Sequence, residues 1–495
     1  MKQVDLLDVL YNKQVYGAKY LNKEVTSLTN DSRSVEPCAC FIALVGEHFD
    51  GHQAVEEVVS QGVQLVVVEN YQPSYADLNA TIVVVPSTFR AQAILANQFY
   101  HEPSRQLQVV AVTGTNGKTT TSSMISDLLT HLDHTTGQIG TLHYKVKDRY
   151  YPAVNTTPDA LTLQSLFNEM VTSGCQDAVI EASSHALALG RLWYTDIDCA
   201  IFTNLTREHL DFHKTMDQYA NAKSLLFSQL GQSFHQGRPR LGIINMDDSY
   251  ASIMAQATGA DIVTYSLEDS KATAYAFDVE DRLGGSRFKI QFKGDNYSAE
   301  IPMRGLYNIS NYLAAFLCLT EYYGYSPQEV IQASQSFKGV PGRMESVQMG
   351  QDFDIIVDFA HTSDALERVM QELSKSKQGR LIALMGHSGG NRDSGARPGI
   401  GDVLFKYADY IVFTADNPRF EKVSKICREM IGDHQEKSYT VIEDRKDAVT
   451  HALEAAQAGD IVLLAGKGGE GYQVIGDDKV PYDDVEEVEA YYQSK

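Results

Sequence analysis

The chain has 495 residues, too many for one compact core, and roughly 150 residues per domain predicts about three domains. Hydrophobic residues make up 43% and charged residues 21%, shares that are ordinary for a folded globular protein and argue against disorder. The 42 Lys and Arg against 64 Asp and Glu give a formal net charge of −22. This charge argues against general binding to nucleic acids or anionic membranes, although a small anionic ligand needs only a local group of donors.

The sequence also indicates a soluble protein of the cytoplasm. No apolar run reaches the roughly 18 residues of a membrane span, and residues 1–13 lack the apolar stretch and cleavage site of a secretory signal. Six cysteines are scattered along the chain, and none forms the C-x-x-C pair typical of metal or redox sites. We expect small-molecule substrates, no nucleic-acid partner, no membrane insertion and a monomer.

Short apolar runs predict three successive α/β units with boundaries near residues 105 and 340. In the first unit, the β-branched runs at 65–68 and 81–85 are typical of buried parallel strands. In the other two units, each such run ends in small or polar residues, as strands do when their carboxyl ends line a site. These runs are LQVVAVTG, DAVIEAS, DCAIFTNL and RLGIINMD, then DIIVDFAH, RLIALMGHSGG, YIVFTADNP and DIVLLAGKGG. Residues from about 265 to 303 predict a β-rich insertion in the second unit.

A phosphate-binding loop is predicted directly after the strand that ends at Val112. The loop consists of Thr113, Gly114, Thr115, Asn116, Gly117, Lys118, Thr119 and Thr120, and a helix-like stretch follows it. Glycines let backbone N–H groups surround phosphate oxygens, and the helix N-terminus adds positive potential. The Lys118 ammonium would neutralise the β- and γ-phosphates, and the Thr119 hydroxyl would bind Mg²⁺. Only two residues separate the glycines, so the spacing differs from the four-residue Walker form. We expect an ATP site here.

Eight short stretches occur in a fixed order along nearly the whole chain and resemble the Mur ligase superfamily. They are GTNGKTT, NTTPD, EASSHAL, FTNLTREHLDFH, YANAKSLLF, GRMESV, DFAHT and DNPR. The resemblance is to the branch that joins an amino acid to UDP-N-acetylmuramoyl-L-Ala-D-Glu in peptidoglycan synthesis. It implies an α/β fold with three domains: an N-terminal UDP-substrate domain (1–105), a central ATP-binding domain with a P-loop ATPase-like parallel sheet (106–339), and a Rossmann-like amino-acid-binding domain (340–495).

The resemblance also implies the reaction and its cofactors, ATP and Mg²⁺. ATP would phosphorylate the D-glutamyl carboxylate, and the incoming amine would attack the acyl phosphate. A carboxylate is a poor electrophile until it is phosphorylated, and two crowded anions need cations between them. Lys118, Glu181, His209 and Lys223 match the catalytic positions, with Thr119, Glu181, His209 and a carbamate on Lys223 (N6-carboxylysine) as metal ligands. Without the resemblance, Glu181 could equally be a capping acid, His209 a surface or core histidine, and Lys223 a solvated lysine.

Further matches suggest where the two nucleotides bind. For the UDP-muramoyl-dipeptide, they are Ser32, Thr156, Thr157, Ser183 and Arg191. For adenine and ribose, they are Asn308 or Asn311, Arg343 and Asp358, so that ATP would bridge two domains. Taken singly, the hydroxyl groups are equally typical of helix caps and turns, and either asparagine could cap a helix.

The third unit is expected to select the amino acid. The matching residues are Arg392, Asp416, Asn417, Arg419, Gly466 and Glu470. Arg392 would bind the α-carboxylate, while Arg419 suits a second carboxylate, as in meso-diaminopimelate, whose distal ammonium Glu470 could meet. Phe420, Glu421, Lys422, Gly469 and Ser363 depart from the family pattern, so L-lysine or another diamino acid stays open.

Two rival functions are weaker. A folylpolyglutamate synthase shares the loop and the ligation chemistry, but it is not expected to carry the DNPR and NDSR stretches. A non-catalytic ATP-binding paralogue predicts the loss of metal or phosphate ligands, and those residues are all present. The departures in the third unit leave a catalytically degraded ATP-binding paralogue as the alternative.

Overall fold

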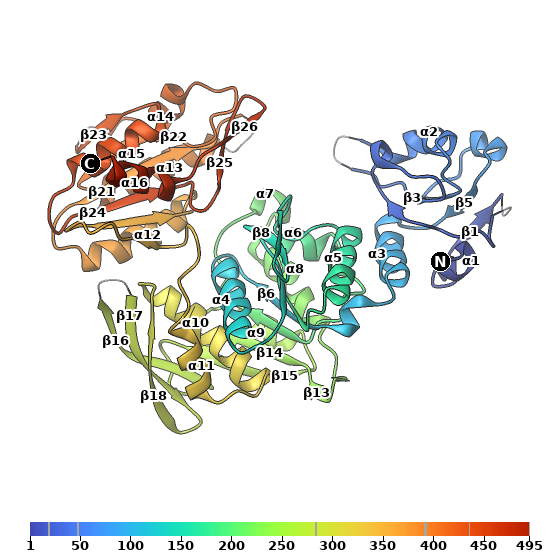
Figure 1. Cartoon of the computed structure of the whole chain (residues 1–495), viewed down its shortest axis with the longest axis horizontal. Coiled ribbons are helices and arrows are strands. Elements are labelled where there is room, and N and C mark those ends of the chain that lie inside the picture. The colour runs from blue at the N-terminus through green and yellow to red at the C-terminus, as the bar shows by residue number, and fades with distance from the viewer. Residues whose placement is uncertain (18–19, 47–48, 283–284, 391–393, 435, 495) are drawn as a thin grey trace. The chain divides into compact units, whose positions relative to one another are not determined.

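The computed structural model (Figure 1) describes the chain except for residues 18–19, 47–48, 283–284, 391–393, 435 and 495. The chain folds into two compact units, each with its own cores. The first comprises Met1–Thr273 and Ala314–Ser326, and the second comprises Ala274–Leu313 and Pro327–Lys495.

The first unit begins with a five-stranded sheet in the order β1-β5-β4-β3-β2. Strands β2 to β5 are parallel, and β1 runs antiparallel to β5. The predicted apolar runs form β4 and β5, whose side chains enter two cores on opposite faces of the sheet. The elements are α1 (Gln3–Leu7), β1 (Gln14–Tyr16), β2 (Leu28–Thr29), β3 (Cys40–Ile42), α2 (Val55–Ser60), β4 (Leu65–Val68), β5 (Thr81–Val84) and α3 (Thr88–Phe99).

A second sheet in this unit has the order β15-β14-β11-β6-β10-β7-β8-β9. The first six of these strands are parallel, and β8 and β9 add an antiparallel edge. The strands are β6 (Gln108–Thr113), β7 (Thr136–Ile139), β8 (His143–Val146), β9 (Arg149–Pro152), β10 (Asp177–Glu181), β11 (Cys199–Phe202), β14 (Leu241–Asn245) and β15 (Asp261–Ser266). A small separate hairpin is formed by β12 (Phe234–His235) and β13 (Arg238–Pro239).

Helices fill the connections of this sheet. They are α4 (Lys118–His131), α5 (Ala160–Thr172), α6 (Ser184–Ala188), α7 (Leu210–His213), α8 (Met216–Ser228) and α9 (Ala251–Gln256). Alternate residues of β6 and β10 enter a core with α5, α6, α8 and α9. Strand β6 lies between β10 and β11, which are later in the chain, so the sheet order changes direction there. Parallel α/β sheets bind ligands at the carboxyl ends of strands beside such a switch point.

The second unit starts with an antiparallel meander, which is the predicted β-rich insertion. Strands β16 (Ala274–Arg282), β17 (Gly285–Phe292) and β18 (Asp295–Ile301) pair in sequence. Helix α10 (Leu306–Leu317) follows, and α11 (Pro327–Ser334) precedes the last sheet.

The last sheet has the order β19-β20-β24-β21-β22-β23, with β19 antiparallel and the others parallel. Helices α12, α13 and α14 pack on one face and α15 and α16 on the other. The strands are β19 (Glu345–Val347), β20 (Asp354–Asp358), β21 (Leu381–His387), β22 (Tyr410–Ala415), β23 (Ser438–Val441) and β24 (Ile461–Ala465), with a hairpin of β25 (Tyr472–Ile475) and β26 (Asp478–Pro481). The helices are α12 (Ser363–Ser376), α13 (Arg397–Tyr407), α14 (Val423–Ile431), α15 (Arg445–Ala455) and α16 (Asp484–Gln493). This doubly wound arrangement and the sheet around β6 confirm the predicted α/β class.

No helix in the described parts of the chain is long and apolar enough to cross a membrane.

Candidate functional site

The predicted phosphate loop connects the buried strand β6 to the N-terminus of α4. Gly114 has a φ of +155°, and a Cβ atom there would lie 1.9 Å from the Thr203 hydroxyl oxygen, so only glycine fits. Gly117 has a φ of +83° immediately before Lys118 opens the helix. Asn204 fixes the loop from β11, because its side chain accepts from Asn116 N at 3.0 Å and its backbone carbonyl accepts from Thr115 N at 2.8 Å. The result is a rigid helix N-terminus suited to an anion.

Two lysines meet at this loop. The Lys118 ammonium donates to the carbonyl oxygens of Gly114 and Thr115 at 3.0 and 2.8 Å, and the Lys223 ammonium donates to the same Gly114 oxygen at 2.7 Å. Lys223 lies in α8 with an exposed fraction of 1%, above the ring of Tyr219. Burial and the charge of Lys118 hold the pKa of Lys223 well below its usual value. Lys223 is therefore not a solvated lysine, and an anion beside it would relieve the repulsion.

Glu181 forms an oxygen-rich cluster at the carboxyl end of β10. The side chain is fully buried, and its Oε2 accepts from the Thr119 hydroxyl at 3.0 Å. Thr141 donates to the same carboxylate twice, from its backbone N at 2.9 Å and from its hydroxyl at 3.1 Å. Carboxylate and hydroxyl oxygens are the hard ligands that Mg²⁺ prefers, so Thr119 and Glu181 fit the predicted metal position. Among the described residues, no three His, Cys, Asp or Glu side chains gather as a self-sufficient metal site.

His209 lies at the start of α7 with its side chain 43% exposed and its Nε2 3.7 Å from Glu208. Its ring is 4.8 Å from that of His185 and 6.2 Å from that of Tyr219. Burial lowers the pKa of His209, and the charges of Lys118 and Lys223 lower it further against the opposing effect of Glu208. The imidazole is therefore biased toward the neutral form, which is the form that binds metals.

Three of the five predicted UDP-substrate residues form one hydrogen-bonded group. The Thr157 hydroxyl donates to the Glu181 carbonyl at 2.5 Å and accepts from Ser183 N at 3.1 Å, and Arg191 donates to the Thr157 carbonyl at 2.8 Å. Ser183 also caps α6 by accepting from the N–H of Ala186.

The other two UDP-substrate residues have separate positions. The Thr156 hydroxyl lies 3.1 Å from that of Thr141, whereas Ser32 opens a short 3-10 helix beside the first sheet. Among the described residues, no hydrogen bond joins Ser32 to the other four.

The predicted adenine and ribose residues lie in the second unit. Asn308 donates to the Arg304 carbonyl at 2.8 Å, and both Asn308 and Asn311 are buried. Asp358 is buried as well, and its two carboxylate oxygens accept from the backbone N–H groups of Met344 at 2.7 Å and Ala360 at 2.8 Å. Burial raises the pKa of Asp358. Its carboxylate thus closes a turn at the end of β20.

Arg343 extends from the turn that Asp358 closes. Its guanidinium lies over the ring of Phe359, 4.8 Å from the ring centroid. A planar cation held on an aromatic face beside the end of β20 suits a nucleotide contact.

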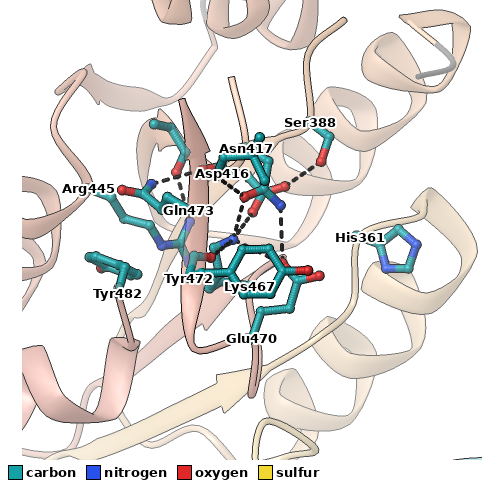
Figure 2. Close-up of polar contacts among 12 residues, drawn as sticks. His361, Ser388, Asp416, Asn417, Arg445, Lys467, Glu470, Tyr472, Gln473 and Tyr482 are labelled. Atoms are coloured by element: carbon teal, nitrogen blue, oxygen red, sulfur yellow. Dashed lines mark hydrogen bonds and ion pairs between the residues drawn. The ribbon is translucent and has the colours of Figure 1, made fainter. Parts of the chain in front are cut away.

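The residues predicted to bind the amino acid gather at the carboxyl ends of β22 and β24 (Figure 2). Asp416 and Asn417 follow β22, while Gly466 and Glu470 follow β24. The Asn417 amide donates to Glu470 Oε2 at 3.1 Å, and Ser388 at the end of β21 donates to Asp416 at 2.7 Å. The predicted Arg392 lies outside the described residues.

Arg419 is fixed by its backbone in the left-handed region, at a φ of +53°. Its N–H donates to the Val474 carbonyl at 3.0 Å, and its own carbonyl accepts from Gly476 N at 2.9 Å, so it pairs with the β25 hairpin. Its buried Nε has no hydrogen-bond partner among the described residues. A substrate carboxylate would satisfy this donor.

Sequence reasoning missed Lys467, Arg445, Ser388 and Gln473, which surround Asp416. Lys467 is fully buried and pairs with Asp416 and Glu470, each at 3.0 Å. The only sequence signal was a lysine within the glycine-rich run after β24, a pattern more typical of a loop that faces a ligand.

Three Mur ligase sequence profiles match the chain. They are the Mur ligase family catalytic domain over residues 24–100, the Mur ligase middle domain over 112–319, and the glutamate ligase domain over 342–468.

Curated relatives and a solved structure are similar over almost the full length. Proteins named UDP-N-acetylmuramoyl-L-alanyl-D-glutamate–2,6-diaminopimelate ligase from Listeria monocytogenes serotype 4b and Geobacillus thermodenitrificans are 40% and 41% identical, covering 93% and 94% of both chains. A solved structure of a protein with the same name is 30% identical, covers 100% of this chain and 99% of its own, and superposes with a TM-score of 0.71.

Proposed function

Because the chain belongs to the Mur ligase family, we propose that it is an ATP-dependent ligase that adds meso-diaminopimelate to the D-glutamyl carboxylate of UDP-N-acetylmuramoyl-L-Ala-D-Glu. The product is the tripeptide precursor of peptidoglycan. The observation that carries the proposal is the near-full-length similarity to relatives of that name, in a chain whose phosphate loop, Glu181 and Lys223 are all in place. The protein acts as a cytoplasmic monomer with the three domains expected at 1–105, 106–339 and 340–495.

Phosphoryl transfer takes place at the loop between β6 and α4. The D-glutamyl carboxylate attacks the γ-phosphorus of ATP, and ADP leaves. The Lys118 ammonium and the N–H groups at the start of α4 balance the charge that builds up on the phosphate oxygens. Thr119 and Glu181 would hold Mg²⁺, with His209 as a further ligand, and the ion would supply charge neutralisation for the phosphate oxygens.

Lys223 carries a carbamate in the active enzyme. Only a neutral amine attacks CO₂, and the lowered pKa of Lys223 increases the fraction of that form at a given pH. The Lys223 ammonium first loses one proton. The neutral amine then forms an N–C bond with CO₂ and releases a second proton, so that a cation beside Lys118 is replaced by an anion. The buried carbamate then pairs with Lys118 and offers oxygen atoms toward the metal.

The second step joins the amino acid. The neutral amine of the amino acid attacks the acyl carbon, the tetrahedral intermediate loses phosphate, and the nitrogen releases a proton. The UDP substrate is held by Ser32, Thr156, Thr157, Ser183 and Arg191, and the adenosine of ATP by Asn308 or Asn311, Arg343 and Asp358. Arg392 binds the α-carboxylate of the amino acid.

The choice of meso-diaminopimelate over L-lysine is supported by the state of Asp416. A lysine-adding enzyme needs this carboxylate free for the lysine ammonium, but here Oδ1 forms an ion pair with Lys467 at 3.0 Å and Oδ2 accepts from Ser388 at 2.7 Å. Arg419 supplies the cation that a second substrate carboxylate requires, and Glu470 meets the distal ammonium.

The proposal is tested by ATP-dependent phosphate release with UDP-N-acetylmuramoyl-L-Ala-D-Glu and, in turn, meso-diaminopimelate, L-lysine, L-ornithine or no amino acid. Release that depends on meso-diaminopimelate is expected. Phosphate release that depends on L-lysine would support the ligase function but overturn the role of Arg419 in binding a second substrate carboxylate. The absence of phosphate release with every amino acid tested would overturn the ligase function itself.

A further inference from the structure

Lys467 is a buried cation at the centre of the amino-acid-binding loops, and the proposed reaction gives it no role. Its exposed fraction is 0%. Its ammonium lies 3.0 Å from Asp416 Oδ1, 2.9 Å from Asn417 Oδ1, 3.0 Å from Glu470 Oε2 and 2.8 Å from the Tyr472 carbonyl oxygen. Figure 2 shows the Lys467 ammonium below Asp416 and Asn417, with the Glu470 side chain rising toward the same group from the loop after β24. This lysine holds three separate segments, those that follow β22 and β24 and the start of β25.

The charges of this cluster do not cancel. Asp416 and Glu470 bring two negative charges and Lys467 brings one positive charge. Burial alone would raise the pKa of Asp416, but the charges of Lys467 and Arg445 keep it below its usual value, so Asp416 stays ionised. One negative charge is left for a ligand.

The remaining charge is concentrated on one atom of Glu470. Both oxygens of Asp416 face internal groups: Oδ1 lies 3.0 Å from the Lys467 ammonium in an ion pair without a hydrogen bond, and Oδ2 accepts from the Ser388 hydroxyl. Glu470 uses Oε2 for Asn417 and Lys467, and no hydrogen bond or ion pair from a described residue reaches its Oε1. The Glu470 side chain is 29% exposed, so Oε1 can meet a substrate ammonium from the solvent side.

A second buried cation fixes the strands that carry these loops. Arg445 donates to the carbonyl oxygens of Ala415 at 3.1 Å and Ala465 at 3.0 Å, the last residues of β22 and β24. Asp484 accepts from the same guanidinium at 2.9 and 2.7 Å, and both side chains are fully buried. The loops therefore start from a rigid base, and Lys467 sets the positions of the side chains beyond it.

We propose that Lys467 is a positioning residue that determines amino-acid specificity: it withdraws Asp416 from the substrate and aims the single remaining carboxylate oxygen, Oε1 of Glu470, at the distal ammonium. This inference rests on the proposed function. It assigns the discrimination between meso-diaminopimelate and L-lysine to a residue that touches neither.

Removing the Lys467 charge has two separable consequences. Glu470 loses the partner that orients it, so meso-diaminopimelate binds more weakly. Asp416 loses its internal cation, so a second carboxylate becomes available to an ammonium, and L-lysine gains relative to meso-diaminopimelate. A residue with only a structural role would weaken both amino acids equally.

The experiment measures kcat and KM for both amino acids, ATP and the UDP substrate in Lys467→Met. A hydrogen bond to a charged group contributes about 1.5–3 kcal/mol, so the KM for meso-diaminopimelate should rise about 10- to 100-fold. The KM values for ATP and the UDP substrate should change less than about twofold, and the ratio of kcat/KM for L-lysine to that for meso-diaminopimelate should increase. Lys479→Met, an exposed lysine of the β25–β26 hairpin, is the matched control and should behave as the wild type.

Two further variants keep the test decisive. If Lys467→Met does not fold because Asp416 is left unpaired, the charge-balanced Asp416→Asn/Lys467→Met variant removes both charges and should still show the increased KM for meso-diaminopimelate. In a Glu470→Gln background, Lys467→Met should add little to that KM, because its effect passes through Glu470.

The inference is overturned if the KM for meso-diaminopimelate stays unchanged, if all substrates weaken together, or if the effects of Lys467→Met and Glu470→Gln are additive. A wild-type enzyme that does not use meso-diaminopimelate as a substrate would overturn the proposed function, and with it the specificity role of Lys467.

Discussion

The proximity of Lys118 and Lys223 leads to a quantitative prediction. Their ammonium nitrogens lie 3.0 and 2.7 Å from one carbonyl oxygen, so they are at most about 6 Å apart. Two like charges at this separation repel by roughly 3 kcal/mol at an effective dielectric constant of about 20. A carbamate on Lys223 would replace this repulsion with an attraction of similar size. Lys223→Met removes the attraction, and about 3 kcal/mol in a transition state corresponds to a loss of roughly 100-fold in kcat.

The assay compares phosphate release in CO₂-free buffer with release after bicarbonate is added. The wild type should lose activity without CO₂ and regain it with bicarbonate, and ¹³C-bicarbonate should give a carbamate signal in the NMR spectrum that Lys223→Met lacks.

Activity should also fall as the pH drops through the lowered pKa of Lys223, because the protonated amine cannot react with CO₂. Lys271→Met, an exposed lysine of the same unit, is the control. Full activity in Lys223→Met, or wild-type activity that does not depend on CO₂, would refute the presence of a functional carbamate on Lys223.

Three further predictions concern the other parts of the site. Lys118→Ala should abolish turnover and leave the thermal midpoint nearly unchanged; normal turnover would contradict the phosphate-loop assignment. Arg419→Ala should raise the KM for meso-diaminopimelate more than that for L-lysine, and equal increases would remove its carboxylate-binding role. Arg445→Met leaves the buried Asp484 without its cation, with only the Tyr482 hydroxyl still donating to it, and should lower the unfolding free energy of the second unit by about 3–5 kcal/mol. Urea unfolding followed by circular dichroism should detect this loss. The fluorescence of Trp193, the single tryptophan, should show that the stability of the first unit is unchanged. A loss below about 1 kcal/mol would contradict the stabilising role of the Arg445–Asp484 pair.

The strand–loop–helix element of the phosphate site was predictable because each part has a local signal. A continuous apolar run marks β6, the two glycines mark the turn, and polar helix formers follow Lys118. The structure adds the reason that Gly114 is required, which is the Thr203 hydroxyl from a strand about 90 residues later. No local pattern contains that contact.

The burial of Lys223 and Lys467 could not be predicted from the sequence. Lys223 lies in an Ala-rich helix where exposure is the default, and Lys467 lies in a glycine-rich run where a ligand contact is the default. Both are buried because residues distant in sequence, Gly114 in one case and Asp416 in the other, receive their ammonium groups. The domain boundaries near 105 and 340 stay predictions, because the compact units of the structure join Ala274–Leu313 to the C-terminal sheet.

The proposed enzyme forms an amide bond between meso-diaminopimelate and a UDP-muramoyl-dipeptide. The most direct measurement incubates the enzyme with ATP, Mg²⁺, UDP-N-acetylmuramoyl-L-Ala-D-Glu and an equimolar mixture of meso-diaminopimelate, L-lysine and L-ornithine, and identifies the nucleotide product by mass spectrometry. We expect one dominant product, the tripeptide that ends in meso-diaminopimelate, with one ADP and one phosphate formed per amide bond. A dominant lysine or ornithine product, or ATP hydrolysis without a new amide, would contradict it.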